Sequence, residues 1–140
     1  MPVSRRDLAL LLPALTTAGT AAQEQKKALP SKVYQFEELP VKVNGQNKSR
    51  AVLDGALHTG VAVELHITEL GPGQAPHAPH KHEHEEILML RSGELDVTIS
   101  GQTSRATAGS VVIVASNEMH GWRNPGSDSA LYFVIALGKA

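Results

Sequence analysis

Four histidines lie within eight residues of one another in the middle of this chain: His77, His80, His82 and His84. The acidic pair Glu85-Glu86 follows at once, and His120 comes one hairpin and a strand later. Imidazole nitrogens combined with a carboxylate oxygen suit a divalent transition metal such as manganese, iron, cobalt, nickel, copper or zinc. The cluster therefore predicts a metal site, and it is the part of the chain that says most about function.

Alternate residues of an extended chain face the same side. Here that set comprises His80, His82, His84 and Glu86. Leu88 continues this face toward a core and is a candidate pocket residue, while a later strand must supply His120 from the opposite wall. Three imidazoles and one carboxylate would leave two positions of an octahedral ion open to water or substrate.

The elements that position the cluster read as short strands, because period-two alternation and turn residues dominate and no long helical pattern occurs. The strands expected are Val33–Phe36, Lys48–Leu57, Val61–Leu70, Glu86–Leu90, Glu94–Ser100, Thr103–Thr107, Val111–Val114, His120–Asn124 and Ala130–Leu137. Ser92-Gly93 is expected to form a hairpin turn. Eight or nine short strands at regular spacing predict an all-β sandwich or barrel.

At the histidines the sequence resembles the cupin family. The first cupin motif has a leading glycine, two histidines, a glutamate and a second glycine. His80, His82, Glu86 and Gly93 match it in type and spacing, whereas Gly73 lies one residue too far upstream for the leading glycine. The second motif contains a glycine, a histidine and an asparagine, matched by Gly109, His120 and Asn124. Ala115 and Asn117 replace its proline and second glycine, and Asn117 is expected to tolerate the left-handed backbone that glycine would supply.

The resemblance implies a cupin-type jelly-roll barrel, a double-stranded β-helix, that holds one divalent transition metal. It assigns the ligand positions to His80, His82, Glu86 and His120. His84 has two interpretations, as a partner that orients a ligand ring or as a solvated loop residue, and the non-ligand role is favoured. Cupins commonly pair through their sheets, so a homodimer is expected, with Val33–Phe36 as a strand that could cross to the partner.

Three further side chains are candidates for the pocket or the chemistry. Trp122 shares the parity of His120 and either walls a substrate pocket or belongs to the barrel core. Glu118 also shares that parity and is either an acid–base catalyst or an exposed turn residue. His66 lies on a strand where Val61, Val63, Leu65 and Ile67 form one face and Glu64, His66 and Thr68 form the other. The alternation leaves open which of those faces meets the pocket.

The N-terminus resembles an export signal. Arg5-Arg6 precedes a short apolar run over residues 8–15, and small residues lead to Ala22. This pattern predicts a signal peptide of the twin-arginine type over residues 1–22, with an amphipathic helix or uncleaved anchor as the alternative. Residues 23–31 then form a linker before one domain over 32–140, and the mature protein is expected in the periplasm. The apolar run is too short to span a membrane, so no stable span is expected.

Composition excludes several classes of function. The formal net charge is −1 and no basic run occurs, which argues against nucleic-acid binding. The chain has no cysteine, so disulfides, zinc–thiolate sites, iron–sulfur clusters and thiol nucleophiles are all excluded. With 140 residues and 41% hydrophobic residues, the chain can bury one core of ordinary size.

Two functions remain. The favoured one is a metal-dependent enzyme acting on a small oxygen-rich substrate, with dioxygenase chemistry placed slightly ahead of isomerase, decarboxylase or lyase chemistry. The alternative is a non-catalytic periplasmic protein that binds a metal or small ligand. An acid–base group beside the metal would favour the enzyme, and Glu118, Glu64 and His66 are the candidates.

Overall fold

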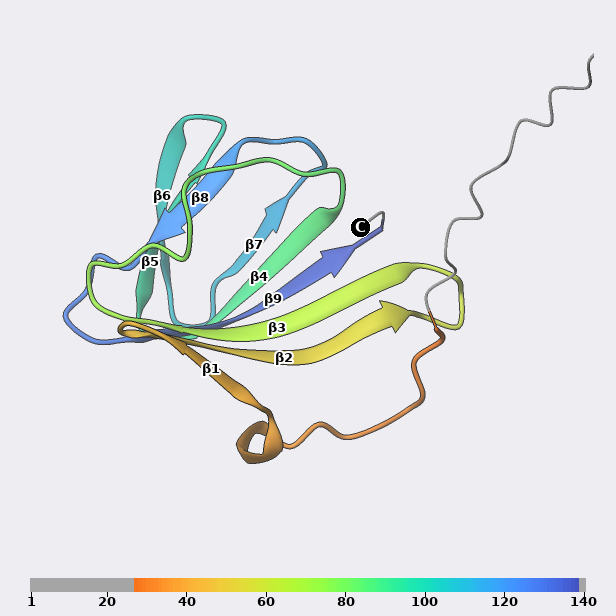
Figure 1. Cartoon of the computed structure of the whole chain (residues 1–140). Coiled ribbons are helices and arrows are strands. Elements are labelled where there is room, and N and C mark those ends of the chain that lie inside the picture. Colours follow the sequence, from red (N-terminus) through yellow and green to blue (C-terminus); the bar gives the residue numbers. More distant parts are fainter. Residues whose placement is uncertain (1–26, 139–140) are drawn as a thin grey trace, which may run out of the picture.

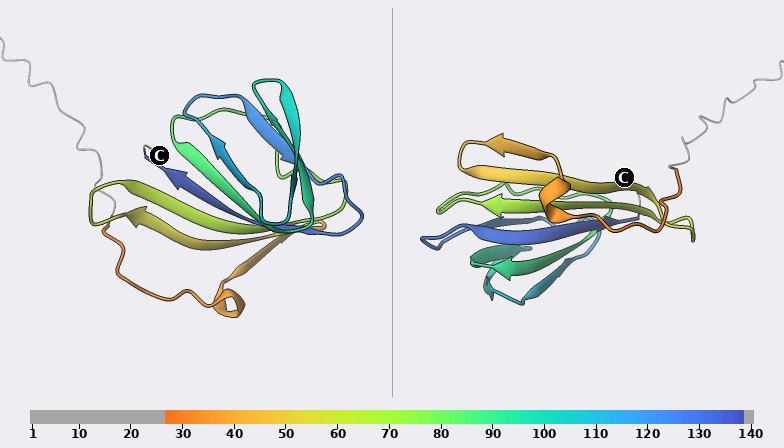
Figure 2. Two further views of the ribbon diagram at one scale, coloured as in Figure 1. Left: turned by 180° about the vertical axis from the view of Figure 1, so that it is seen from behind. Right: turned by 90° about the horizontal axis from the view of Figure 1, so that it is seen from below.

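Two antiparallel sheets face each other in the computed structural model, which describes residues 27–138 (Figure 1). The larger sheet has the order β1-β2-β3-β9-β4-β7, and the smaller has the order β6-β5-β8. Seen from below, the large sheet forms a broad twisted layer on which the small one closes (Figure 2). The fold is all-β, as the strand pattern predicted, and its two sheets form the jelly roll that the cupin resemblance implied.

The larger sheet consists of β1 (Val41–Asn44), β2 (Asn47–Ala56), β3 (Ala62–Leu70), β4 (Glu85–Ser92), β7 (Val111–Val114) and β9 (Ala130–Leu137). The smaller sheet consists of β5 (Glu94–Ile99), β6 (Gln102–Thr107) and β8 (His120–Arg123). Eight of these nine strands coincide with predicted ranges to within two residues at either end. The ninth, β1, was not predicted.

The first predicted strand, Val33–Phe36, is wrong. That segment is irregular and leads into η1, a 3-10 helix over Phe36–Glu38. Val33 is 73% exposed, and Phe36 packs its ring under the guanidinium of Arg50 at 4.3 Å. The ring of Phe36 thus holds this segment against Arg50 of β2. Among the described residues, no strand pairs with the backbone of residues 33–36.

The real first strand, β1, forms a hairpin with β2 in which Asn44 opposes Asn47. Gly45 has a φ of 59°, a left-handed conformation that glycine adopts without a steric penalty. Asn-Gly between two strands is the strongest short-range hairpin signal, so Asn44-Gly45 was the clue that could have predicted β1.

The predicted hairpin at Ser92-Gly93 is also wrong. β4 pairs with β7 and β9, whereas β5 pairs with β6 and β8, so the chain changes sheets at this point. Gly93 has a φ of 79°, and a Cβ there would lie 2.7 Å from the Cα of Ala130. In the sequence, a glycine at a sharp corner beside another strand cannot be distinguished from a glycine in a hairpin turn.

The predicted linker is partly ordered along β2. The backbone N–H of Leu29 donates to the carbonyl of Ala56 at 2.9 Å, and the N–H of Ala56 donates to Lys27 at 3.1 Å. Leu29 fills the space beside Gly55, where a Cβ would lie 2.8 Å from its side chain. The expected signal peptide and residues 23–26 lie outside the described residues. Within residues 27–138, no helix is long and apolar enough to cross a membrane.

The core lies between the two sheets. Its buried members include Leu70, Leu88, Leu95, Val97, Tyr132 and Val134. Tyr132 is 1% exposed, and its hydroxyl accepts a hydrogen bond from the indole nitrogen of Trp122 at 2.9 Å. Burial raises the pKa of Tyr132 to about 12, so the phenol stays neutral in this packed layer.

Candidate metal centre

The loop between β3 and β4, residues 71–84, carries the histidine cluster across the top of the small sheet. A single antiparallel bridge joins His80 to His120, with 2.9 Å hydrogen bonds between N–H and carbonyl in both directions. This bridge places the loop against the first residue of β8. His120 was predicted to come from the wall opposite Glu86, and β8 does belong to the other sheet.

The chain is not extended throughout residues 80–86, as the argument for a shared face had assumed. The chain bends at Glu83 and His84, and β4 begins only at Glu85. The ring nitrogen Nδ1 of His82 hydrogen-bonds to the carbonyl of His84 at 2.9 Å across this bend. The histidines therefore meet through a bridge and a bend, because the loop must turn down from β8 into β4.

The rings of His80, His82 and His120 contact one another in all three pairs. Their centroids are 5.1 Å apart for His80 and His82, 4.7 Å for His80 and His120, and 4.8 Å for His82 and His120. One ring nitrogen from each lies within 4.8 Å of the others. This spacing allows the three nitrogens to reach a common ion.

Glu86, the second residue of β4, points its carboxylate toward the rings of His82 and His120. Its Oε2 lies 3.3 Å from Nε2 of His82, and its Oε1 lies 3.6 Å from Nε2 of His120. Glu86 is 7% exposed, so its carboxylate has exchanged water for these imidazoles. Its neighbours Leu88 and Leu90 point the same way and are buried in the core, as the alternation predicted.

Four buried side-chain atoms of this cluster have no hydrogen-bond partner: Nδ1 of His80, Nε2 of His82, Nε2 of His120 and Oε1 of Glu86. Leaving a buried polar atom unpaired costs about 1–3 kcal/mol. The far nitrogens of two rings are held by backbone, since Nδ1 of His120 bonds to the carbonyl of Glu118 at 2.9 Å and that of His82 bonds to His84. The cluster therefore holds four unpaired donor atoms, three imidazole nitrogens and one carboxylate oxygen, which is the donor set of a divalent transition metal.

His84 and His77 lie at the edge of the cluster. His84 stacks on His82 at 3.5 Å, and its Nε2 lies 3.8 Å from Oε2 of Glu86, so His82, His84 and Glu86 form a second group that could hold an ion. His77 meets the ring of His80 edge to face at 4.2 Å. Desolvation by burial lowers the pKa of both His80 and His84, which favours their neutral, metal-binding form.

His66 and Glu64 lie on the interior side of β3. Nδ1 of His66 is 3.0 Å from Oε1 of Glu64, and the two side chains are 34% and 39% exposed. The charge of Glu64 acts to raise the pKa of His84 against the larger effect of burial. The alternation could not choose the face of β3, and the structure assigns Val63 and Ile67 to the side opposite His66.

Trp122 and Leu88, predicted as pocket residues, belong to the hydrophobic core. Trp122 is 6% exposed and stacks on the ring of His120 with centroids 5.9 Å apart. Trp122 is therefore a core residue, the second of the two roles predicted for it. Its ring also packs against the ring of His120.

Glu118 lies in the turn before β8. Its carboxylate accepts a hydrogen bond from the hydroxyl of Ser100 at 3.1 Å, and its backbone carbonyl is the group that holds His120. Asn117, one residue earlier, adopts a φ of 62°, as expected for its substitution at the glycine position of the motif. The parity argument for Glu118 fails because the strand that would extend it begins only at His120.

Asn124 has a role that the sequence analysis did not identify. Its side-chain amide donates to the carbonyls of Leu70, Gly71 and Asp128, and its oxygen accepts from the N–H of Gly126. These bonds tie the start of the histidine loop to the end of β8. The motif position was recognisable, but the partners lie on three separate segments.

Comparison with known proteins decides the family. The model of the cupin domain matches residues 66–136, about half of the chain and the part that contains both motifs. This chain is a cupin. A search of curated proteins found no match.

Several solved structures resemble it in fold. An RmlC-like cupin from Shewanella frigidimarina has a TM-score of 0.65 and 18% identity, covering 79% of this chain and 93% of that one. A predicted oxalate decarboxylase from Thermotoga maritima has a TM-score of 0.68 and 20% identity, covering 77% and 100%. The polyketide cyclase RemF from Streptomyces resistomycificus has a TM-score of 0.64 and 18% identity, covering 79% and 81%. At these identities the likeness establishes the fold of this cupin.

Proposed function

We propose that this cupin is a metal-dependent enzyme in which His80, His82, Glu86 and His120 hold one divalent transition metal. The observation that supports this is the set of four buried, unpaired donor atoms, one from each residue. A bound metal would supply a Lewis acid for a carbonyl or enolate oxygen, or a site for dioxygen if it is redox-active. We place dioxygenase chemistry on a small oxygen-rich substrate slightly ahead of isomerase, decarboxylase or lyase chemistry.

His66 and Glu64 are our candidates for proton transfer at this site. They form a hydrogen-bonded pair at 3.0 Å, they remain accessible, and the charge of Glu64 acts on the pKa of His84 in the cluster. A carboxylate that orients an imidazole is a common arrangement for a general base. Glu118, the other candidate from the sequence, has its carboxylate bonded to Ser100 and is the weaker choice.

The first experiment is metal analysis by mass spectrometry on the exported protein, purified without added metal or chelator. About one iron or manganese per chain would support the proposal and justify oxygen-uptake assays with small diols, enols and keto acids. An empty or randomly mixed site would favour the alternative, a non-catalytic cupin that binds a small ligand.

The acid–base assignment has its own test. His66→Gln is expected to lower kcat by at least about 100-fold while the metal content stays at the wild-type level. Full activity in this variant, or loss of metal along with activity, would remove His66 from the mechanism. His58→Gln is the matched control, since His58 bonds to the carbonyl of Leu29 away from the cluster.

We further propose that the protein is exported to the periplasm and forms a homodimer. The arginine pair and apolar run at the N-terminus support export. Met89, Val111 and Ile113 support a dimer, because they expose apolar side chains on β4 and β7 at the outer face of the large sheet. Cell fractionation of an Arg5→Lys, Arg6→Lys variant tests the first proposal, and analytical ultracentrifugation tests the second. The predicted crossing strand is not part of this proposal, because residues 33–36 form no strand here and Phe36 packs on Arg50 of β2.

A further inference from the structure

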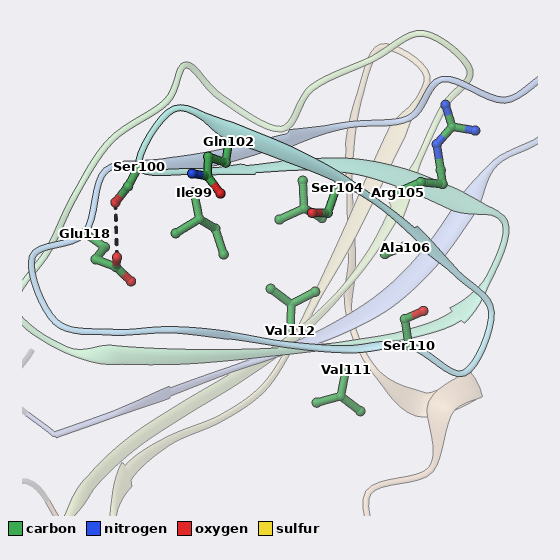
Figure 3. Close-up of a pocket in the computed structure, with 11 residues that line it drawn as sticks. Ile99, Ser100, Gln102, Ser104, Arg105, Ala106, Ser110, Val111, Val112 and Glu118 are labelled. Atoms are coloured by element: carbon green, nitrogen blue, oxygen red, sulfur yellow. Dashed lines mark hydrogen bonds between the residues drawn. The ribbon is translucent and has the colours of Figure 1, made fainter.

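A cavity of about 590 Å³ opens between β6 and β7, the edge strands of the two sheets (Figure 3). These strands follow each other in the sequence through a turn at residues 108–110, yet they do not pair, so the barrel is open along this line. We call this space the seam cavity. Its volume is within the range of small-molecule sites, and none of the four proposed metal ligands lines it.

The seam cavity has an apolar floor. Val97, Ile99, Ala106 and Val112 contribute it, and all four are core residues or pack against the core. Ile99 and Val112 point toward each other across the cavity from the two sheets (Figure 3). An apolar body held between them would gain the favourable free energy of leaving water.

Polar side chains surround this floor. They are Ser100, Gln102, Ser104 and Ser110, all neutral. Among the lining residues only Arg105 and Glu118 carry a charge. The guanidinium of Arg105 is turned away, since it donates to Asp96 at 2.6 Å and to Glu94 at 2.8 Å on the outer face (Figure 3).

Glu118 therefore sets the charge of the seam cavity. Its carboxylate lies at one end, where it accepts a bond from the hydroxyl of Ser100 (Figure 3). A carboxylate offers about four acceptor positions, so one serine hydroxyl leaves most of them available to a ligand. A cation with N–H donors matches this end, and an apolar group matches the floor.

We propose that the seam cavity is a second binding site of this cupin, for a small primary amine with an apolar body whose ammonium group rests on Glu118. None of the four proposed metal ligands lines the site, although Ile99 of its floor is the strand partner of His120, and the proposal does not depend on the proposed enzyme activity. Glu118 is nevertheless adjacent to the cluster through its backbone carbonyl, which holds the ring of His120.

Phenethylammonium is the probe. Two compounds of similar shape serve as controls: phenethyl alcohol, which is uncharged, and hydrocinnamate, which carries a negative charge. Amide chemical shifts of the metal-loaded full chain are followed by NMR. Saturable shifts confined to the residues that line the seam cavity are expected for the amine, with weaker binding of the alcohol and none of the acid. The same result is expected after chelation of the metal.

Two variants test the assignment. Glu118→Gln is expected to lower the affinity for the amine about tenfold, because one charge-assisted hydrogen bond is lost. Glu37→Gln on the exposed helix η1 is the control and should leave the affinity unchanged. Ser104→Phe fills the cavity from an exposed position and is expected to abolish binding while the thermal midpoint stays near that of the wild type. Equal affinity for amine and alcohol, unchanged affinity in Glu118→Gln, or the absence of saturable shifts would each overturn the proposal.

Discussion

Two buried polar residues at the two ends of β8 are treated in opposite ways by this fold. Asn124 is fully buried and its side chain makes four hydrogen bonds, three as donor and one as acceptor. His120, four positions earlier, is 1% exposed and leaves Nε2 without a partner. Both are motif residues, and both are surrounded by the same barrel.

The difference separates a stabilising site from a binding site. A satisfied buried amide fixes the segments that it joins, whereas unpaired buried atoms cost stability until something pairs with them. Around His120 the unpaired atoms come from four residues of one cluster, which is what a preformed ion site requires. Changes at Asn124 should therefore act on folding, and changes in the cluster should act on binding.

The largest effect is expected at Asn124. Asn124→Ala leaves the carbonyls of Leu70, Gly71 and Asp128 without their donor, and we expect a loss on the order of 4 kcal/mol in the free energy of unfolding. Urea denaturation of the metal-free protein measures it. Asn124→Asp, which keeps the size and the acceptor but loses the donors, should be nearly as unstable. A loss below about 1 kcal/mol would show that water replaces the amide.

The cluster should respond in the reverse way. His82→Ala removes one unpaired atom, so the metal-free protein is expected to unfold at the same urea concentration as the wild type or a higher one. The variant should lose the stabilisation that metal binding adds to the folded protein. In the wild type this stabilisation is about 3 kcal/mol at a free metal concentration of about 100 Kd. Thermal melts with and without zinc measure this gain, and Lys81→Ala is the control. If metal-free His82→Ala were as unstable as Asn124→Ala, the distinction between a folding role for Asn124 and a binding role for the cluster would be wrong.

A smaller difference is expected within the cluster itself. His80→Ala should reduce metal affinity by at least about 100-fold, whereas His84→Ala should change it by less than about 10-fold, the effect of an outer partner. His84 stacks on His82 and lies 3.8 Å from Glu86, which suits a supporting role. Competition with a chelating dye measures both affinities. Equal losses in the two variants would replace the proposed ligand set with one that includes His84.

The smallest effect is a pH dependence of the metal-free protein. Burial is the main cause that lowers the pKa of His80 below its ordinary value of 6.5, with help from the charges of His77, His120 and His82. The unfolded chain then binds this proton more readily, so stability is lost as pH falls below about 6.5 toward the folded pKa. Urea midpoints between pH 8 and pH 5 should decline less steeply in His80→Gln. Identical slopes would contradict a depressed pKa at His80.

Much of this fold could be predicted because its signals are local. Alternation along Val61–Leu70 and the apolar run Val111–Val114 identify strands without reference to partners, since side chains alternate with a period of two on any pleated strand. The left-handed backbone at Asn117 was likewise predictable from the residue alone. The failures at Val33–Phe36 and Ser92-Gly93 share one cause, since each depends on which distant strand edge lies beside the segment.

By itself, the sequence determined the strand-rich class of this cupin and the residue types that could bind a metal, because alternation and side-chain chemistry belong to each residue. The tertiary structure alone decided that His80 bridges to His120, that Asn124 joins three segments, and that β6 and β7 part to leave the seam cavity. These features arise from pairing between segments far apart in the chain, and pairing depends on which edges meet when the two sheets close.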